Sequence, residues 1–145
     1  MSLLSRLAVP LTEGRCYVIA EVGSNHMGSL ESAVEHIEMA AKCGADAAKF
    51  QLFRLADILI DPALGDPRTE MPAEWLPKLS DACREYRIDF LCTPFAPWAV
   101  EALEPFMWAY KIGSFEWQRD DIWQACVTPG NTIIASCGRG RKFNP

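Results

Sequence analysis

The stretch SLESAVEHIEMAAKCGADAAKFQ, residues 29–51, decides the fold class. Its first part predicts a helix over Ser29–Cys43, because Ser29 is a suitable N-cap and apolar residues recur on one face at Leu30, Val34, Ile37 and Ala41. Gly44 supplies the left-handed conformation that ends a helix. The next run, Ala45–Ala48, predicts a short buried strand, and it is followed by the polar string Lys49-Phe50-Gln51.

The same alternation of strand and helix extends in both directions from this stretch. Short, continuous apolar runs predict four more strands, at Cys16–Ala20, Ile88–Cys92, Trp108–Tyr110 and Thr132–Ala135. Helical spacing between them predicts helices at Trp75–Arg87, Trp98–Glu104 and Asp121–Val127. This order indicates a parallel sheet with right-handed crossovers. The long segment Arg54–Pro72 interrupts the rhythm and is typical of a functional lid or a disordered loop.

Composition excludes several classes of protein. The 145 residues are 50% hydrophobic with a formal net charge of −5, which is ordinary for one globular domain and unsuited to binding nucleic acid or a membrane surface. None of the six cysteines has C-x-x-C spacing, so no zinc site is indicated. Four of them (Cys16, Cys83, Cys92 and Cys126) fall in apolar runs and are expected to pack as small hydrophobes. We therefore expect a reduced, cytoplasmic protein with neither a signal peptide nor a membrane span.

Polar residues follow each predicted strand. Glu21, Asn25 and His26 come after the first, and Lys49 and Gln51 after the second. The later strands are followed by Thr93 and Phe95, by Lys111, Ser114 and Glu116, and by Ser136. In parallel α/β folds the ligand site lies beyond the carboxyl ends of the strands, so these groups should converge. Two lysines and three hydroxyls can hold a phosphate and a carboxylate, and Glu21 is the candidate for proton transfer.

The strings IAEVGSNHMGSLESA, GADAAKFQ, DFLCTPF, YKIGSFE and IIASCG together resemble the sialic-acid synthase family. That family includes N-acetylneuraminate, legionaminate and pseudaminate synthases and a related spore-coat polysaccharide protein. The resemblance covers residues 13–138 and implies an α/β fold of the TIM type, a (β/α)₈ barrel truncated here to about five strands and four helices. It implies condensation of phosphoenolpyruvate with an N-acylated hexose, with release of phosphate, aided by Mn²⁺ or Mg²⁺.

The resemblance also implies roles for single residues. Lys49, Thr93, Lys111, Ser114 and Ser136 match the phosphoenolpyruvate contacts. Glu21 matches the essential carboxylate, and Gln51 a residue that faces the sugar. We expect Asn25, His26, Phe95 and Glu116 to line the site, with His26 either lining it or ordering its loop.

Residues 1–145 are thus expected to form the amino-terminal part of one barrel domain, with 139–145 as a tail. A full barrel needs roughly 250 residues. The later strands that carry the family's metal-binding histidines, and its antifreeze-like domain, are absent from the sequence, so the chain alone is expected to be inactive and to form homo-oligomers. Two alternatives stay open: a non-catalytic phosphoenolpyruvate-binding remnant or half-barrel module, and a Schiff-base aldolase that uses Lys49 or Lys111.

Overall fold

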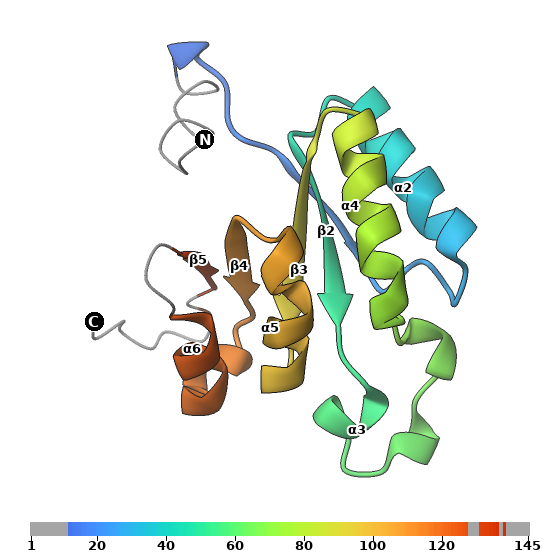
Figure 1. Cartoon of the computed structure of the whole chain (residues 1–145), viewed down its shortest axis with the longest axis vertical. Coiled ribbons are helices and arrows are strands. Elements are labelled where there is room, and N and C mark those ends of the chain that lie inside the picture. Colours follow the sequence, from blue (N-terminus) through green and yellow to red (C-terminus); the bar gives the residue numbers. More distant parts are fainter. Residues whose placement is uncertain (1–11, 128–130, 137, 139–145) are drawn as a thin grey trace.

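The computed structural model describes residues 12–127, 131–136 and 138. Its centre is a five-stranded sheet in which every pairing is parallel and the strand order follows the chain, β1-β2-β3-β4-β5 (Figure 1). The strands are β1 (Ile19–Gly23), β2 (Ala47–Leu52), β3 (Asp89–Pro94), β4 (Ala109–Ile112) and β5 (Thr132–Ala135). The predicted parallel α/β arrangement is confirmed. Within the described residues β1 and β5 each pair with one neighbour.

The first four strands begin and end later than the apolar runs predict, and the start is displaced most at β1. Cys16, which we expected inside the first strand, is exposed and lies three residues before Ile19. The expectation that Cys16 packs as a core residue is therefore wrong. The polar residues Glu21 and Lys49 belong to β1 and β2 themselves, because paired strands continue through polar residues when hydrogen bonding to the neighbouring strand continues.

Four helices of seven or more residues connect the described strands, and all four agree with the predicted positions. They are α2 (Leu30–Lys42), α4 (Leu76–Glu85), α5 (Pro97–Leu103) and α6 (Asp120–Cys126). Ser29 caps α2 as predicted, since its side chain accepts a hydrogen bond from Ser32 N at 3.1 Å. Helix α2 packs beside α4, and α5 beside α6 (Figure 1).

The two faces of the sheet differ in character. The main core lies between the sheet and the helices and includes Phe50, Leu52 and Tyr110 from the strands. The opposite face carries a separate small cluster of Ala47, Leu91 and Ala109, all fully buried. Because side chains alternate along a strand, Lys49, Thr93 and Lys111 project from the same face as this cluster, two residues nearer the carboxyl ends. None of the described helices covers this face (Figure 1), and this helix-free face is apolar at one end and polar at the other.

The segment between β2 and α4 is ordered by short helical turns. It contains α3 (Leu55–Ile58) and three 3-10 turns, Pro62–Leu64, Pro67–Thr69 and Ala73–Trp75. Leu55 N donates a hydrogen bond to Glu70 Oε1 at 2.5 Å, which closes the segment on itself. Figure 1 places α3 beyond the arrowhead of β2, at the carboxyl edge of the sheet.

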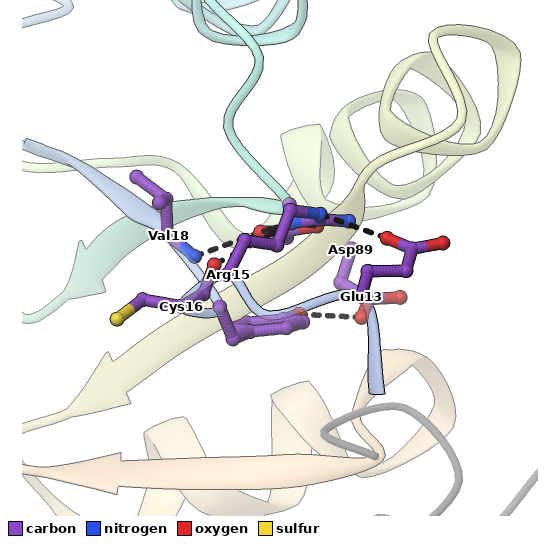
Figure 2. A network of polar contacts seen from close by, with 7 residues as sticks. Glu13, Arg15, Cys16, Val18 and Asp89 are labelled. Atoms are coloured by element: carbon purple, nitrogen blue, oxygen red, sulfur yellow. Dashed lines mark hydrogen bonds and ion pairs between the residues drawn. The ribbon is translucent and has the colours of Figure 1, made fainter. Parts of the chain in front are cut away.

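A polar network joins the amino ends of the first three strands (Figure 2). Arg15 Nη1 lies 2.8 Å from both carboxylate oxygens of Asp46, and Val18 N donates to Asp46 Oδ2 at 2.8 Å. Tyr17 donates its hydroxyl proton to Asp89 Oδ2 at 2.5 Å. These contacts fix the amino edge of the sheet.

The predicted tail 139–145 and its basic residues lie outside the described residues. None of the helices in the described part of the chain has the length and apolar character needed to cross a bilayer.

Candidate active site

Strand pairing brings the predicted site residues into neighbouring positions at the carboxyl edge. Glu21 pairs in register with Lys49, and Gln51 pairs with Thr93. Ser136 follows β5 directly, and its backbone N–H donates to Ile112 O at 3.0 Å, which ties it to the end of β4. The parallel arrangement therefore gathers these side chains at one edge of one face.

The first group of contacts is centred on Lys49. Its side chain is 7% exposed, and its Nζ lies 2.5 Å from Glu21 Oε2, whereas the Glu21 side chain is 58% exposed. The same Nζ makes a longer contact of 3.4 Å with the hydroxyl of Thr93. Burying an ammonium group is costly unless it is paired, and Glu21 supplies the pairing charge. The carboxylate stays open to a ligand while the ammonium group is held in place.

The second group of contacts is centred on Lys111. Its Nζ donates to Ile112 O at 2.9 Å and to Ser136 Oγ at 2.5 Å, and the side chain is half-buried. A Cβ added at Gly138 would lie 2.7 Å from Ser114 Oγ, so Ser114 lies directly against Gly138. The ends of β4 and β5 thus bring one ammonium group and two hydroxyls to the same region. Lys111 and Lys49 stand two strands apart, roughly 10 Å at the usual strand spacing.

Gln51 lies beside Gly23, which has a backbone conformation that favours glycine. Gly23 has φ +59, and the pairing of β1 with β2 shifts register between Glu21 and Gly23. A Cβ added at Gly23 would stand 3.5 Å from Gln51 Oε1 and 3.6 Å from Glu21 Oε1. The absence of a side chain at this position keeps the space between the amide and the carboxylate open.

The loop after β1 places Asn25 and His26 differently. Asn25 is exposed, and its backbone N–H donates to Val22 O at 3.1 Å. His26 is fully buried, accepts a hydrogen bond from Gly28 N at its Nδ1 at 3.1 Å, and meets Trp75 edge to face at 5.4 Å between ring centroids. Burial lowers the pKa of His26, which favours the neutral imidazole. These contacts order the loop and connect it to the segment before α4.

Phe95 and Glu116 border the same edge. Phe95 packs against Phe53 at 5.4 Å between ring centroids, in an edge-to-face arrangement, and so forms an aromatic pair past the ends of β2 and β3. The Glu116 carboxylate lies against Gly113, since a Cβ added at Gly113 would stand 2.2 Å from Glu116 Oε2. Glu116 is therefore close to the turn that follows Lys111.

A divalent cation does not fit the described residues by themselves. Residues 12–127, 131–136 and 138 contain no group of three or more His, Cys, Asp or Glu side chains placed to hold a metal ion. Glu21, the carboxylate nearest the centre of the site, is already paired with Lys49. The involvement of Mn²⁺ or Mg²⁺ stays a prediction, and no chemical step is derived through it.

Three residues of the site were not identified from the sequence, namely Gly23, Phe53 and Gly138. The two glycines follow polar strand ends in the strings Glu-Val-Gly and Ser-Cys-Gly, which is a usable signal for a close approach of backbone to a side chain. Phe53 gave no such signal, because one more apolar residue after a buried strand is indistinguishable from core.

Several proteins with known names are similar to this chain in sequence. The spore coat polysaccharide biosynthesis protein SpsE of Bacillus subtilis is 39% identical over 69% of this chain and 31% of its own length. A pseudaminic acid synthase of Campylobacter jejuni is 32% identical over 88% of this chain and 42% of its own length. The chain thus spans less than half the length of these relatives.

Solved structures show the same fold. The N-acetylneuraminic acid (sialic acid) synthetase of Leptospira borgpetersenii, crystallised with citrate, superimposes with a TM-score of 0.80 and 26% identity, over 86% of this chain and 45% of its own. The NeuB family model matches residues 36–142. Over most of its length, therefore, this chain belongs to the NeuB family.

Proposed function

We propose that this chain forms the phosphoenolpyruvate-binding part of a nonulosonic acid synthase. The observation that carries the proposal is the pairing of each lysine with a hydroxyl on the helix-free face: Lys49 with Thr93, and Lys111 with Ser136. Phosphoenolpyruvate carries a phosphate and a carboxylate, and two ammonium groups about 10 Å apart at the backbone can each reach one of them. Ser114 adds a further hydroxyl donor beside Gly138.

Glu21 is suited to the proton transfers of the reaction. C3 of the enol attacks the aldehyde carbon of the open-chain sugar, whose oxygen takes up a proton. Water adds at C2 with loss of a proton, and phosphate leaves as the C2 ketone forms. The exposed Glu21 carboxylate can hold one of these protons, and Lys49 keeps it oriented at 2.5 Å. Gln51 lies beside it across Gly23, in a position to donate to a sugar hydroxyl.

The proposal also covers the sugar that accepts the three-carbon unit of phosphoenolpyruvate. The relatives named above include synthases of pseudaminic and sialic acids, whose names denote nine-carbon acidic sugars with acylated amino groups. The aromatic pair of Phe53 and Phe95 gives the carboxyl edge an apolar wall against which an N-acyl methyl group can pack. We therefore expect an N-acylated hexose as the second substrate.

Calorimetric titration with phosphoenolpyruvate tests the binding step. We expect binding by the 145-residue chain, with pyruvate at least tenfold weaker because it lacks the phosphate that meets an ammonium group. Ser136→Ala should weaken the binding of phosphoenolpyruvate, while Ser80→Ala, at the opposite edge, serves as the matched control. Equal affinities for phosphoenolpyruvate and pyruvate would contradict the proposal.

A second candidate is an aldolase that forms a Schiff base. Lys49 favours it, because its side chain is 7% exposed and its ammonium group lies beside a carboxylate that could take its proton. Borohydride reduction in the presence of pyruvate would add a stable pyruvyl group to Lys49 if the aldolase reading holds. Phosphate release from phosphoenolpyruvate and N-acetylmannosamine with Mn²⁺, without such trapping, would support the synthase, whereas binding with neither reaction would identify a non-catalytic module.

A further inference from the structure

Arg87 adopts a backbone conformation for which an arginine is poorly suited. Its φ is +60, in the left-handed region. Helix α4 ends just before it, with Ile88 N donating to Cys83 O at 3.0 Å and Arg87 N donating to Arg84 O at 3.2 Å. This pair of bonds forms a Schellman cap, whose left-handed position is usually glycine because a Cβ crowds the carbonyl there.

The same chain builds the same cap with glycine after α2. Ala45 N donates to Ala40 O and Gly44 N to Ala41 O, both at 3.0 Å, and Gly44 has φ +81. The two caps connect a helix to the next strand in the same way. The geometry of the turn therefore gives no reason for an arginine at position 87.

Arg87 lines a cavity at the amino edge of the sheet. The cavity has a volume of about 590 Å³, within the range of small-molecule sites. Its apolar wall includes Ile88, Phe106 and Trp108, which come from the start of β3 and from the turn before β4. In Figure 1 this edge is the upper one. The strand arrowheads point to the opposite edge, where the candidate active site lies.

Four charged side chains line the cavity, Asp81, Arg84, Arg87 and Asp89, and three of them have polar partners among the described residues. Arg84 is paired with Asp81, and Asp89 accepts a hydrogen bond from Tyr17. Within residues 12–127, 131–136 and 138, the Arg87 guanidinium has neither an ion pair nor a hydrogen bond. The formal charges of the lining therefore cancel, but the Arg87 guanidinium is left free to meet a ligand above an apolar wall.

We propose that this cavity binds a small anion that carries a flat apolar ring. A carboxylate or phosphate group would accept two parallel hydrogen bonds from the Arg87 guanidinium, and the ring would pack against Trp108 and Phe106. Asp89 (Figure 2) lines the cavity and accepts a hydrogen bond from Tyr17, two residues before β1, so an occupant would contact the network that fixes the amino edge. This site is separate from the candidate active site and does not depend on the proposed synthase activity.

An arginine near a helix C-terminus also has a simpler role, which is to offset the partial negative charge of the last carbonyls. The two roles predict opposite effects of Arg87→Gly on stability. If the guanidinium mainly stabilises the helix end, the variant should lose stability. If the Arg87 side chain mainly binds a ligand, the unliganded variant should melt about 2–4 °C higher, because glycine adopts the left-handed conformation without strain.

The binding test uses three probes on the 145-residue chain: benzoate, phenyl phosphate and the neutral benzyl alcohol. The readout is the indole N–H resonance of Trp108, assigned by its loss in Trp108→Phe. We expect one or both anions to shift this resonance saturably and benzyl alcohol to bind at least tenfold more weakly. The comparison of benzoate with phenyl phosphate shows which anionic group the site takes. No shift by either anion, or equal affinity for benzyl alcohol, would overturn the proposal.

Variants then locate the site. Arg87→Gly should bind the anion at least tenfold more weakly while its melting temperature rises, and Arg87→Lys should retain part of the affinity. Gly44→Arg, the matched change at the other cap, should lower the melting temperature and leave binding unchanged. Lys111→Met removes a cation from the opposite edge and should also leave the Trp108 shift unchanged. Full affinity in Arg87→Gly, or loss of the shift in Lys111→Met, would refute the assignment.

Discussion

Replacing Glu21 by glutamine should reveal how much the chain depends on compensating a buried ammonium group. The change keeps the shape of the side chain and removes the charge that faces Lys49 Nζ at 2.5 Å. Lys49 would then be a buried cation whose remaining described partner is the long contact to Thr93 at 3.4 Å. We expect Glu21→Gln to be less stable than the native chain.

The exposure of the two partners sets the magnitude. An ion pair with both partners exposed contributes about 0–1 kcal/mol, whereas removing one partner of a fully buried pair costs about 3–5 kcal/mol. Here the lysine side chain is 7% exposed and the glutamate 58%. Because water reaches the carboxylate and screens it, the cost should lie nearer the lower limit, at about 1–2 kcal/mol. Lys49→Met removes the charge and keeps the volume, so it should change stability by less than about 1 kcal/mol or even increase it.

Urea denaturation of the native chain, Glu21→Gln, Lys49→Met and the double variant measures this coupling. Glu21→Gln should lower the midpoint at constant slope, and the double variant should recover most of the loss, since no buried cation is left to compensate. Glu35→Gln, an exposed glutamate in α2, is the matched control and should be nearly neutral. An equal cost of Glu21→Gln with and without Lys49 would refute the reasoning.

Three further predictions follow from the same structure. Lys111→Ala should weaken phosphoenolpyruvate by more than tenfold in calorimetry and leave the thermal unfolding curve nearly unchanged, because Lys111 is half-buried and donates outward to Ser136; unchanged affinity would remove it from the site. Iodoacetamide at pH 8 should modify the exposed Cys43 and spare Cys83 and Cys126, because burial raises the pKa of Cys83 to about 12 and that of Cys126 to about 11. Peptide mass spectrometry should show the labelling of Cys83 and Cys126 increase as the pH rises. The chain should sediment at micromolar concentration as an oligomer, because β1 and β5 leave open sheet edges among the described strands; a cooperatively unfolding monomer would contradict this.

The periodic parts of the sequence predicted the fold well. The helix α2 agrees within a residue at each end with the prediction from Ser29 and Gly44, because a side-chain cap and a left-handed glycine are local signals. The start of β1 was misplaced because Cys16–Val18 is as apolar as a strand. The structure shows that Val18 is instead held through its backbone N–H by Asp46, a contact between residues distant in the sequence.

Some contacts of the candidate site could be predicted from the sequence, and others could not. Parallel strands end at one edge, so the gathering of Glu21, Lys49 and Thr93 could be predicted from the ends of the apolar runs. The register shift at Gly23 and the burial of His26 against Trp75 could not, because both depend on packing between segments far apart in the chain.

The order of the strands has a consequence for the time course of synthesis. Each strand of the sheet pairs with the one that immediately precedes it in the chain, as Ile19 pairs with Ala47 and Ala109 with Thr132. A ribosome releases residues at roughly 5–20 per second, amino terminus first. Every described strand after β1 therefore meets an edge that has already been made, and only β1 waits for a partner still to be translated. The sheet can grow at the pace of translation, one β-α unit at a time.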